Sequence, residues 1–240
     1  MPTFLIIDLI ILLLPISFSF THKLAFYKDL FFVLPAIIIS MAVFILWDHF
    51  FTICGVWGYH SAHYLGIYWM SLPIEQLLFY FALSYFSLFV YAFTKVYITP
   101  EVLKHFNKFI SSIILLVALV LFFSYRKQLY TSISSLLCVF LLTYRTWIAK
   151  PKSLARFYLA FIICLIPVLV IYAILTSFAI TWYDLKYITG IRISAIPIEN
   201  ILFFLSLFLM NVGIYDYLKY WKTVETPLEI IPEKELENKD

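Results

Sequence analysis

Charge and glycine are both scarce in this chain of 240 residues. Charged residues make up 13% of it, about half the fraction typical of soluble domains, whereas 64% of the residues are hydrophobic. Only 5 glycines are present, and neither GxGxxG nor GxxxxGK occurs, so the sequence gives no sign of a nucleotide-binding or flavin-binding loop. The composition argues against a soluble globular domain, and we expect no cofactor.

Residues that could bind metals or nucleic acids are also few. The 3 cysteines are widely spaced and include no CxxC pair, which argues against a disulfide framework and a zinc site. His49, His60 and His63 have no acid or cysteine at ligand spacing to complete a site, so we expect no metal. The formal net charge of +3 is small and dispersed, and we expect no nucleic-acid partner.

Long apolar runs dominate the chain and predict an all-α, polytopic membrane protein with about seven transmembrane helices. The predicted spans are residues 4–20, 30–47, 73–94, 109–125, 129–147, 157–180 and 195–215. A helix needs roughly 17 to 25 residues to cross a bilayer. The first run has no basic segment before it and contains Asp8, so we interpret it as a retained helix and not as a signal peptide.

The basic residues between these runs predict an orientation in the cell membrane. With the N-terminus outside, the cytoplasmic segments hold most of the 17 basic residues, including Lys23, Lys28, Lys95, Lys104, Lys108, Arg145, Lys150, Lys152, Arg156 and four lysines near the C-terminus. The other side keeps Arg126, Lys127, Lys186 and Arg192. Cytoplasmic loops of membrane proteins are enriched in Lys and Arg, so we expect a multi-pass protein with a cytoplasmic C-terminus.

One segment of the chain is repeated. GIYWMSLPIEQLLFY, residues 66–80, aligns without a gap to GIRISAIPIENILFF, 124 residues later. We predict a first three-helix repeat, a linker with a fourth helix, a second repeat and a polar cytoplasmic tail; their boundaries are 1–94, 95–128, 129–218 and 219–240. Three helices and a linking fourth leave both copies in the same orientation, as in parallel repeats related by an axis along the membrane normal.

Each copy carries a glutamate, Glu75 or Glu199, two residues after a proline, Pro73 or Pro197, that we expect to begin a helix. On the predicted topology five acids lie in the outer half: Asp8, Asp48, Glu75, Asp184 and Glu199. Ionisable groups inside a membrane are candidates for function. A helix N-terminus favours an anion by at most about 1 kcal/mol, whereas burial disfavours it by roughly 4–7 kcal/mol. A dry site therefore predicts a neutral, proton-donating glutamate.

Aromatic residues, 20% of the chain, crowd both motifs. The faces of such rings stabilise cations, although aromatic residues also collect at membrane interfaces. The candidate substrate-binding residues are Trp57, Tyr59, Phe79, Tyr183 and Phe203, with Pro73 and Pro197.

The pattern LWD…GVW…LG…LPIEQLLFY followed by WYD…TGIRI…IPIENILFF resembles the small membrane carotenoid cyclases. These are two subunits in Gram-positive bacteria and are fused in archaea and some other bacteria; the resemblance covers nearly all of residues 1–218. A second acid often follows the glutamate in that family, whereas Gln76 and Asn200 follow here.

The resemblance implies a lycopene cyclase, an intramolecular lyase or isomerase of carotenoid biosynthesis that makes β-ionone rings without net redox chemistry. A linear carotenoid such as lycopene would be the substrate, the bilayer the environment, and other carotenoid-synthesis enzymes candidate partners. Glu75 and Glu199 would transfer the proton, either of them being the donor, with Asp48 and Asp184 in support. Three further interpretations stay open: a C50 carotenoid as substrate, a small transporter with parallel repeats, and a non-catalytic subunit of a carotenoid-synthesis assembly.

Overall fold

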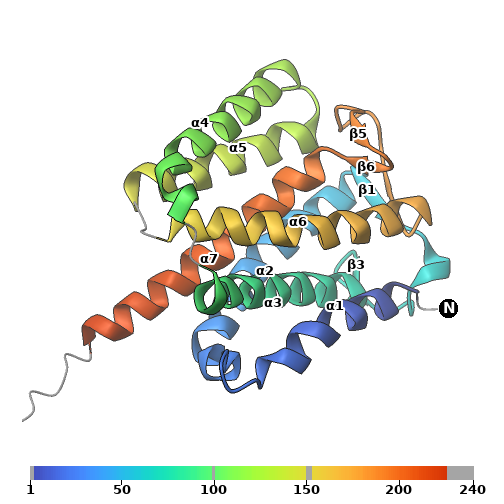
Figure 1. The fold of residues 1–240 in the computed structure, drawn as a ribbon. Helices are drawn as coiled ribbons and strands as arrows, with labels where there is room; N and C mark the ends of the chain where they lie inside the picture. Colours follow the sequence, from blue (N-terminus) through green and yellow to red (C-terminus); the bar gives the residue numbers. More distant parts are fainter. Residues whose placement is uncertain (1–2, 99–100, 150–152, 226–240) are drawn as a thin grey trace, which may run out of the picture.

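The computed structural model describes residues 3–98, 101–149 and 153–225. Within these ranges, seven α-helices run back and forth through one bundle (Figure 1). They are α1 (Thr3–Ser19), α2 (Leu30–Ile53), α3 (Ile74–Tyr97), α4 (Glu101–Ser124), α5 (Leu129–Thr143), α6 (Leu154–Ser177) and α7 (Glu199–Glu225). A π-helical turn, Tyr144–Ile148, continues α5.

Six short strands lie together at the end of the bundle where α1 begins (right in Figure 1). They are β1 (Trp57–Tyr59), β2 (Tyr68–Trp69), β3 (Leu72–Pro73), β4 (Thr181–Tyr183), β5 (Arg192–Ile193) and β6 (Ile196–Pro197). The pairs β2–β3 and β5–β6 are hairpins, and β1 pairs with β4 in the antiparallel sense. This paired-strand end holds the two segments that the sequence repeats.

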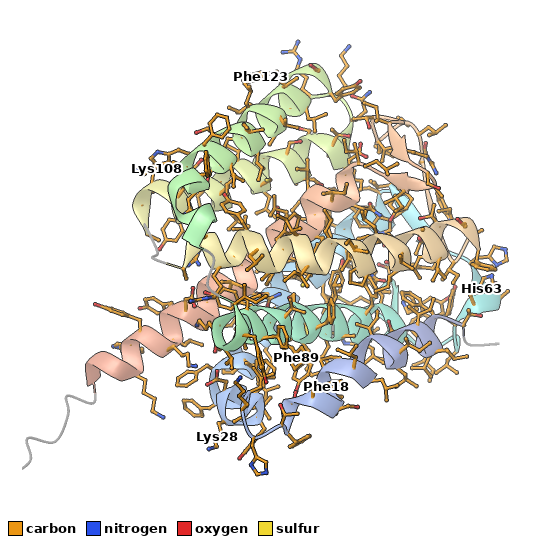
Figure 2. All side chains as sticks on the ribbon, in the orientation of Figure 1. Phe18, Lys28, His63, Phe89, Lys108 and Phe123 are labelled. Atoms are coloured by element: carbon orange, nitrogen blue, oxygen red, sulfur yellow. The ribbon has the colours of Figure 1, made fainter. Side chains whose placement is uncertain are left out.

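The helices have the length and the surface of a membrane protein. Six of them are long and apolar enough to cross a bilayer; α1 is apolar but has 17 residues, about 25 Å at 1.5 Å per residue. Large apolar side chains cover the outside of the bundle, including Phe18 and Phe123 (Figure 2). The predicted all-α polytopic fold is confirmed.

Several helix ends differ from the predicted spans. α2 continues to Ile53, because Gly55 takes a left-handed conformation (φ 72°) and the Val56 N–H then bonds back to the Phe51 carbonyl, a typical glycine-terminated helix end. Asp48 consequently lies within α2. At the other terminus α7 stays helical as far as Glu225, past the predicted start of the polar tail at residue 219; residues 226–240 lie outside the described ranges. The proposed domain boundaries stay predictions.

The expectation that Pro73 and Pro197 begin helices is wrong. Each is the last residue of a hairpin strand, paired with Tyr68 in one repeat and with Arg192 in the other. A proline, which has no N–H to donate, is tolerated at such an edge position. The first helical residues are Ile74 and Glu199.

Local geometry recurs at the 124-residue offset of the sequence repeat. α1 packs against α3 as α5 packs against α7, and α2 contacts α7 as α6 contacts α3. The antiparallel β1–β4 pair places Gly58 opposite Trp182, and these two positions are themselves 124 residues apart. Equivalent strands that pair antiparallel at equivalent residues are related by a local two-fold axis, so the elements of both copies meet around that point.

Candidate active site

A small aromatic cavity lies between the two copies, below the β1–β4 pair. Its volume is ≈ 40 Å³, space on the order of a few water molecules at most. The lining residues are Trp57, Tyr59, Gln76, Phe79, Tyr80, Tyr130, Tyr172, Leu175, Thr181, Tyr183, Asn200 and Phe203. They come from both copies, and most of them are aromatic.

Asp48 is fully buried behind this cavity, and its donors line it. Its carboxylate accepts hydrogen bonds from Trp57 Nε1 at 2.5 Å and from Gln76 Nε2 at 2.6 Å, and from the hydroxyls of Tyr59 and Tyr80 at 3.0 Å. These donors fix the Asp48 carboxyl directly behind an aromatic surface.

The second copy supplies a different set of polar groups. Tyr172 stands 124 residues after Asp48 and lines the cavity itself. Asn200, the counterpart of Gln76, donates to the Tyr183 hydroxyl at 2.9 Å and accepts from the Tyr130 hydroxyl at 3.0 Å. The cavity is therefore asymmetric, because the first copy places the Asp48 carboxyl behind it, whereas the second copy has Tyr172 at the equivalent position.

The two strand tyrosines of the cavity keep their hydroxyl protons: Tyr59 donates to Asp48, and Tyr183 accepts from Asn200. Burial of its hydroxyl raises the pKa of Tyr183 to about 12. Burial, reinforced by the charge of Asp48, raises the pKa of Tyr59 well above its usual 10. Both phenols remain protonated at neutral pH, so Tyr59 keeps its proton for the Asp48 carboxylate.

Glu75 lies at the start of α3 and has one hydrogen-bonded oxygen and one free oxygen. Its Oε1 accepts the Leu65 N–H at 2.6 Å, whereas its buried Oε2 has no partner among the described residues. Asp8, in α1, is fully buried and close enough to Glu75 for the two carboxyls to interact. Neither oxygen of Asp8 has a hydrogen-bond partner within the described ranges.

Glu199 repeats this geometry with one change. Its Oε1 accepts the Thr189 N–H at 2.6 Å, the equivalent of the Leu65 bond, and also the Thr131 hydroxyl at 2.6 Å. Its Oε2 is again buried and unpartnered in the described part of the chain. Where the first glutamate has a neighbouring acid on α1, the second has a hydroxyl donor on α5.

The sequence-predicted residues other than Asp48 fall into four groups in the structure. All five predicted aromatic residues, Trp57, Tyr59, Phe79, Tyr183 and Phe203, line the cavity. Glu75 and Glu199 do not line it; each stands next to a lining amide and one helical turn before a lining phenylalanine, and no hydrogen bond of the described residues joins them. Asp184 lies in the turn after β4, where its carboxylate accepts the Lys186 N–H at 2.8 Å. Pro73 and Pro197 are the last residues of the hairpin strands β3 and β6.

Sequence reasoning missed Gln76, Asn200 and Tyr172 as lining residues, and did not select Asp8. The signals were present: the two amides directly follow the repeated glutamates, and Tyr172 stands at the repeat equivalent of Asp48. Asp8 is the single acid of an otherwise apolar helix.

A family model described as lycopene cyclase matches residues 2–94 and 127–218, more than half of the chain. The chain belongs to the lycopene cyclase family. No curated protein and no solved structure matches it. Each matched segment contains one Pro-Ile-Glu motif, and the unmatched residues between them contain α4.

Membership of the lycopene cyclase family makes the chain an enzyme of carotenoid cyclisation with a carotenoid substrate. The site agrees with that assignment, because it offers acids and aromatic rings in an apolar interior. No cluster of three or more His, Cys, Asp or Glu side chains suited to a metal occurs among the described residues.

Proposed function

We propose that this chain is a lycopene β-cyclase, an intramolecular lyase that converts the linear ends of lycopene or a related carotenoid to β-ionone rings. The observation that carries the proposal is the Asp48 carboxylate, buried behind an aromatic cavity that both copies build. In the reaction a proton adds to C2 of the terminal alkene, the next double bond attacks the resulting tertiary cation, and a ring proton leaves. No electrons are gained or lost overall.

The cavity suits the cationic intermediate. Faces of aromatic rings attract cations most strongly where water is excluded, and a fixed anion stabilises a developing positive charge better in such a site than in water. Asp48 supplies that anion. We assign Asp48 as a counter-ion for the ring cation and not as the proton donor, because both of its oxygens already accept hydrogen bonds.

Glu75, together with Asp8, is the proposed proton donor. Two carboxyls side by side in an apolar site do not both ionise readily, because each charge disfavours the other. The pair therefore retains a proton, and its unpartnered oxygens are available to deliver it. A positioned general acid contributes typically 10²–10⁴-fold to a rate.

Glu199 is the proposed base. Its Oε1 is held by two donors, which leaves the buried Oε2 free to accept the ring proton. The first copy thus provides the acid and the second provides the base, and the repeated motif is used for two different steps.

Substrate binding requires the aromatic side chains to move. A cavity of ≈ 40 Å³ is too small for an isoprenoid end, so the cavity described is a closed form. An apolar groove of ≈ 400 Å³ lies between α1, α3 and α6. Two residues of its wall are close to Asp8 along α1: Ile7 directly precedes it, and Ile11 lies about one turn after it. The polyene chain would lie in this groove, with its end directed toward the acid pair from the membrane.

The deciding experiment is expression of the chain in a bacterium that accumulates lycopene, followed by chromatography of the pigments. Wild type is expected to form β-carotene, or γ-carotene if only one end is cyclised. Glu75→Gln and Glu199→Gln are each expected to lower the yield at least 100-fold at equal protein in the membrane. Asp184→Asn is the matched comparison and should retain nearly full activity, because its carboxylate caps a turn.

Full cyclisation by both glutamine variants would refute the proton-transfer assignment. Unchanged lycopene with abundant wild-type protein would point to a C50 carotenoid or to the transporter alternative, which uptake of labelled solutes into vesicles would test. We also propose the cell membrane as the location, with the N-terminus and the paired-strand end outside. The basic residues of α3, of the π-helical turn after α5 and of α7 then lie on the cytoplasmic side, as the positive-inside rule requires.

A further inference from the structure

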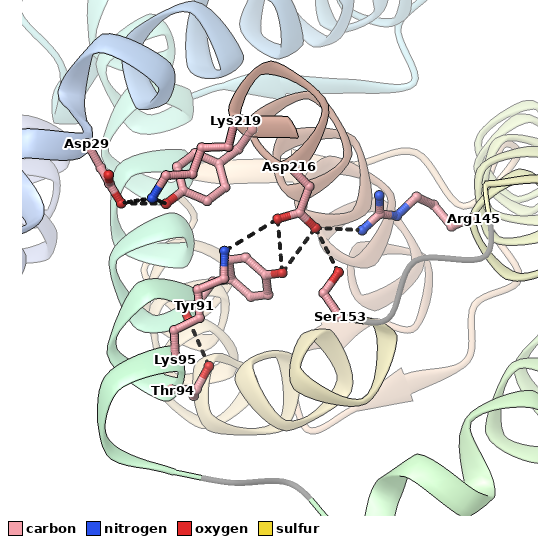
Figure 3. A network of polar contacts seen from close by, with 9 residues as sticks. Asp29, Tyr91, Thr94, Lys95, Arg145, Ser153, Asp216 and Lys219 are labelled. Carbon is pink, nitrogen blue, oxygen red and sulfur yellow. Dashed lines mark hydrogen bonds and ion pairs between the residues drawn. The ribbon is translucent and has the colours of Figure 1, made fainter. Parts of the chain in front are cut away.

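A second polar site lies at the end of the bundle opposite the strands, away from the aromatic cavity (Figure 3). Asp216 of α7 is its centre. The Asp216 carboxylate accepts hydrogen bonds from the hydroxyls of Tyr91 at 3.0 Å and Ser153 at 2.8 Å, and from Arg145 Nη2 at 3.2 Å. Lys95 Nζ lies 3.6 Å from its other oxygen.

Positive charge exceeds negative charge in this site. Lys219 is already paired with Asp29 at 2.7 Å. Lys95 and Arg145 share the single carboxylate of Asp216. Both Lys219 and Arg156 are close enough to Lys95 for their charges to repel it. Two cations on one carboxylate, with further positive charge nearby, leave room for an anion.

Arg145 is poised for such an anion. Its side chain is only 7% exposed, and its Nε has no partner among the described residues. The residue belongs to the π-helical turn Tyr144–Ile148; π-turns inside helices are frequent at functional sites. The Arg145 side chain packs against Gly213. A Cβ added to this glycine would lie 3.7 Å from Arg145 Cδ. Buried polar groups of native proteins nearly always have partners, so an unpaired guanidinium nitrogen indicates a ligand.

The space for that ligand is present. A pocket of ≈ 660 Å³ is bounded by Lys95, Arg145, Ser153 and Lys219, and by the rings of Tyr217 and Tyr220. These two tyrosines are 64% and 71% exposed. The pocket therefore has cationic groups on one part of its wall and exposed aromatic rings on another. A phospholipid suits both, because its phosphate can contact the cations while its acyl chain contacts the rings.

We propose that this pocket binds the phosphate group of an anionic phospholipid, with Arg145 and Lys95 contacting the phosphate. Basic pockets between transmembrane helices on the cytoplasmic side are suited to anionic lipid heads. On the proposed orientation this end faces the cytoplasmic leaflet. The bound lipid would tie together α3, the π-helical turn after α5 and α7, since each of them supplies a lining residue.

The test uses the full chain purified in a neutral detergent. Short-chain phosphatidylglycerol and phosphatidylcholine with identical acyl chains are titrated in parallel, and inorganic phosphate is titrated in a third series. The melting temperature and native mass spectrometry report binding. Phosphatidylglycerol is expected to bind at least ten-fold more tightly than phosphatidylcholine. Equal binding of the two lipids would overturn the proposal, and so would saturation of the same shift by inorganic phosphate alone, since the ligand would then be a free anion.

Two variants place the binding in this pocket. Lys95→Gln removes one partly exposed cation and should weaken phosphatidylglycerol binding about five-fold, the effect expected for one basic residue near a membrane surface. Arg145→Gln combined with Asp216→Asn removes the buried guanidinium and its carboxylate together, so that neither is left buried without the other, and should abolish the lipid preference. Lys108→Gln, an exposed position on α4 (Figure 2), is the matched control.

Loss of the preference in either pocket variant, with Lys108→Gln unaffected, supports the site. If both pocket variants keep the wild-type preference, or if Lys108→Gln weakens it equally, the pocket is not the binding site. Lys95→Gln keeps the test decisive if the double variant fails to fold.

Discussion

At the scale of single residues, the buried carboxyls differ in their partners, and the partners set their chemistry. Asp48 has four strong donors, Glu199 has two, and Glu75 has one together with a neighbouring acid. The roles of counter-ion, base and acid proposed for Asp48, Glu199 and Glu75 follow these differences in hydrogen bonding.

Asp48→Asn tests the counter-ion role. The amide removes the carboxylate and turns an NH₂ group toward donors that need an acceptor. Each donor left unpaired lowers the stability of the fold by about 1–3 kcal/mol. We expect cyclisation to fall at least 100-fold and the melting temperature to drop. Tyr80→Phe is the comparison, because it removes one donor and keeps the ring; its loss should stay below ten-fold. Equal activity of the two variants would contradict the role of the charge.

Residue-level reasoning from sequence succeeded for the aromatic residues and was incomplete for the polar ones. Trp57, Tyr59 and Phe79 could be predicted because they crowd a repeated, acid-containing motif. Gln76 and Asn200 could not be placed, because neighbours on a helix differ by 100° in direction and the sequence does not say which of them faces the partner copy. That choice is made by packing between α2 and α7 and between α3 and α6.

At the scale of elements, the β1–β4 pair is the join between the copies. Its central pair, Gly58 and Trp182, leaves no room for a side chain on the glycine, since a Cβ there would lie 2.5 Å from the Trp182 ring. The strand above the cavity can therefore approach its counterpart only with glycine at this position.

Gly58→Ala is expected to push the Trp182 ring aside and to lower stability by about 1–3 kcal/mol, the usual cost of overpacking. For a chain of this size that corresponds to a few degrees in melting temperature. Trp182→Ala alone should cost less, and the double variant should recover most of the loss, because the two effects act through one contact. Strictly additive losses would show that the ring and the glycine are not coupled.

Helix ends were less predictable than helix centres, for a physical reason. The apolar pattern of the sequence indicates which part of each helix contacts lipid. The helical hydrogen bonds continue beyond that part until a turn or a strand ends the helix. α2 continues to the left-handed Gly55, and α7 begins only after the β5–β6 hairpin. The prolines were misread as helix starts because their pairing partners lie in the preceding hairpin strands.

At the scale of the whole molecule, one site is assembled from two similar halves. The cavity takes residues from both copies, and β1 pairs with β4 across the join. Deeper in the bundle, Asn211 of α7 donates to the Ser84 hydroxyl of α3 at 2.9 Å. The repeat itself predicted the shared architecture, but only the packing shows that the two halves contribute unequal groups to one cavity.

This assembly predicts that the chain can be cut between α3 and α4 without loss of the site. Residues 1–98 and 99–240, expressed together in the lycopene-accumulating host, are expected to form cyclic product, because the contacts between α2 and α7, α3 and α6, and β1 and β4 all survive the cut. Each half alone should leave lycopene unchanged. The first half alone would carry Glu75 and the Asp48 anion but not Glu199.

Chromatography of the pigments and co-purification of the halves through a tag on one of them measure the outcome. Activity from a single half would contradict a shared cavity and would require an acid and a base within one copy. Activity from the pair, lost again when the first half carries Glu75→Gln or the second carries Glu199→Gln, would place one essential carboxyl in each half. The repeat would then be essential to the chemistry as well as to the fold, since neither copy holds the acid, the base and the counter-ion together.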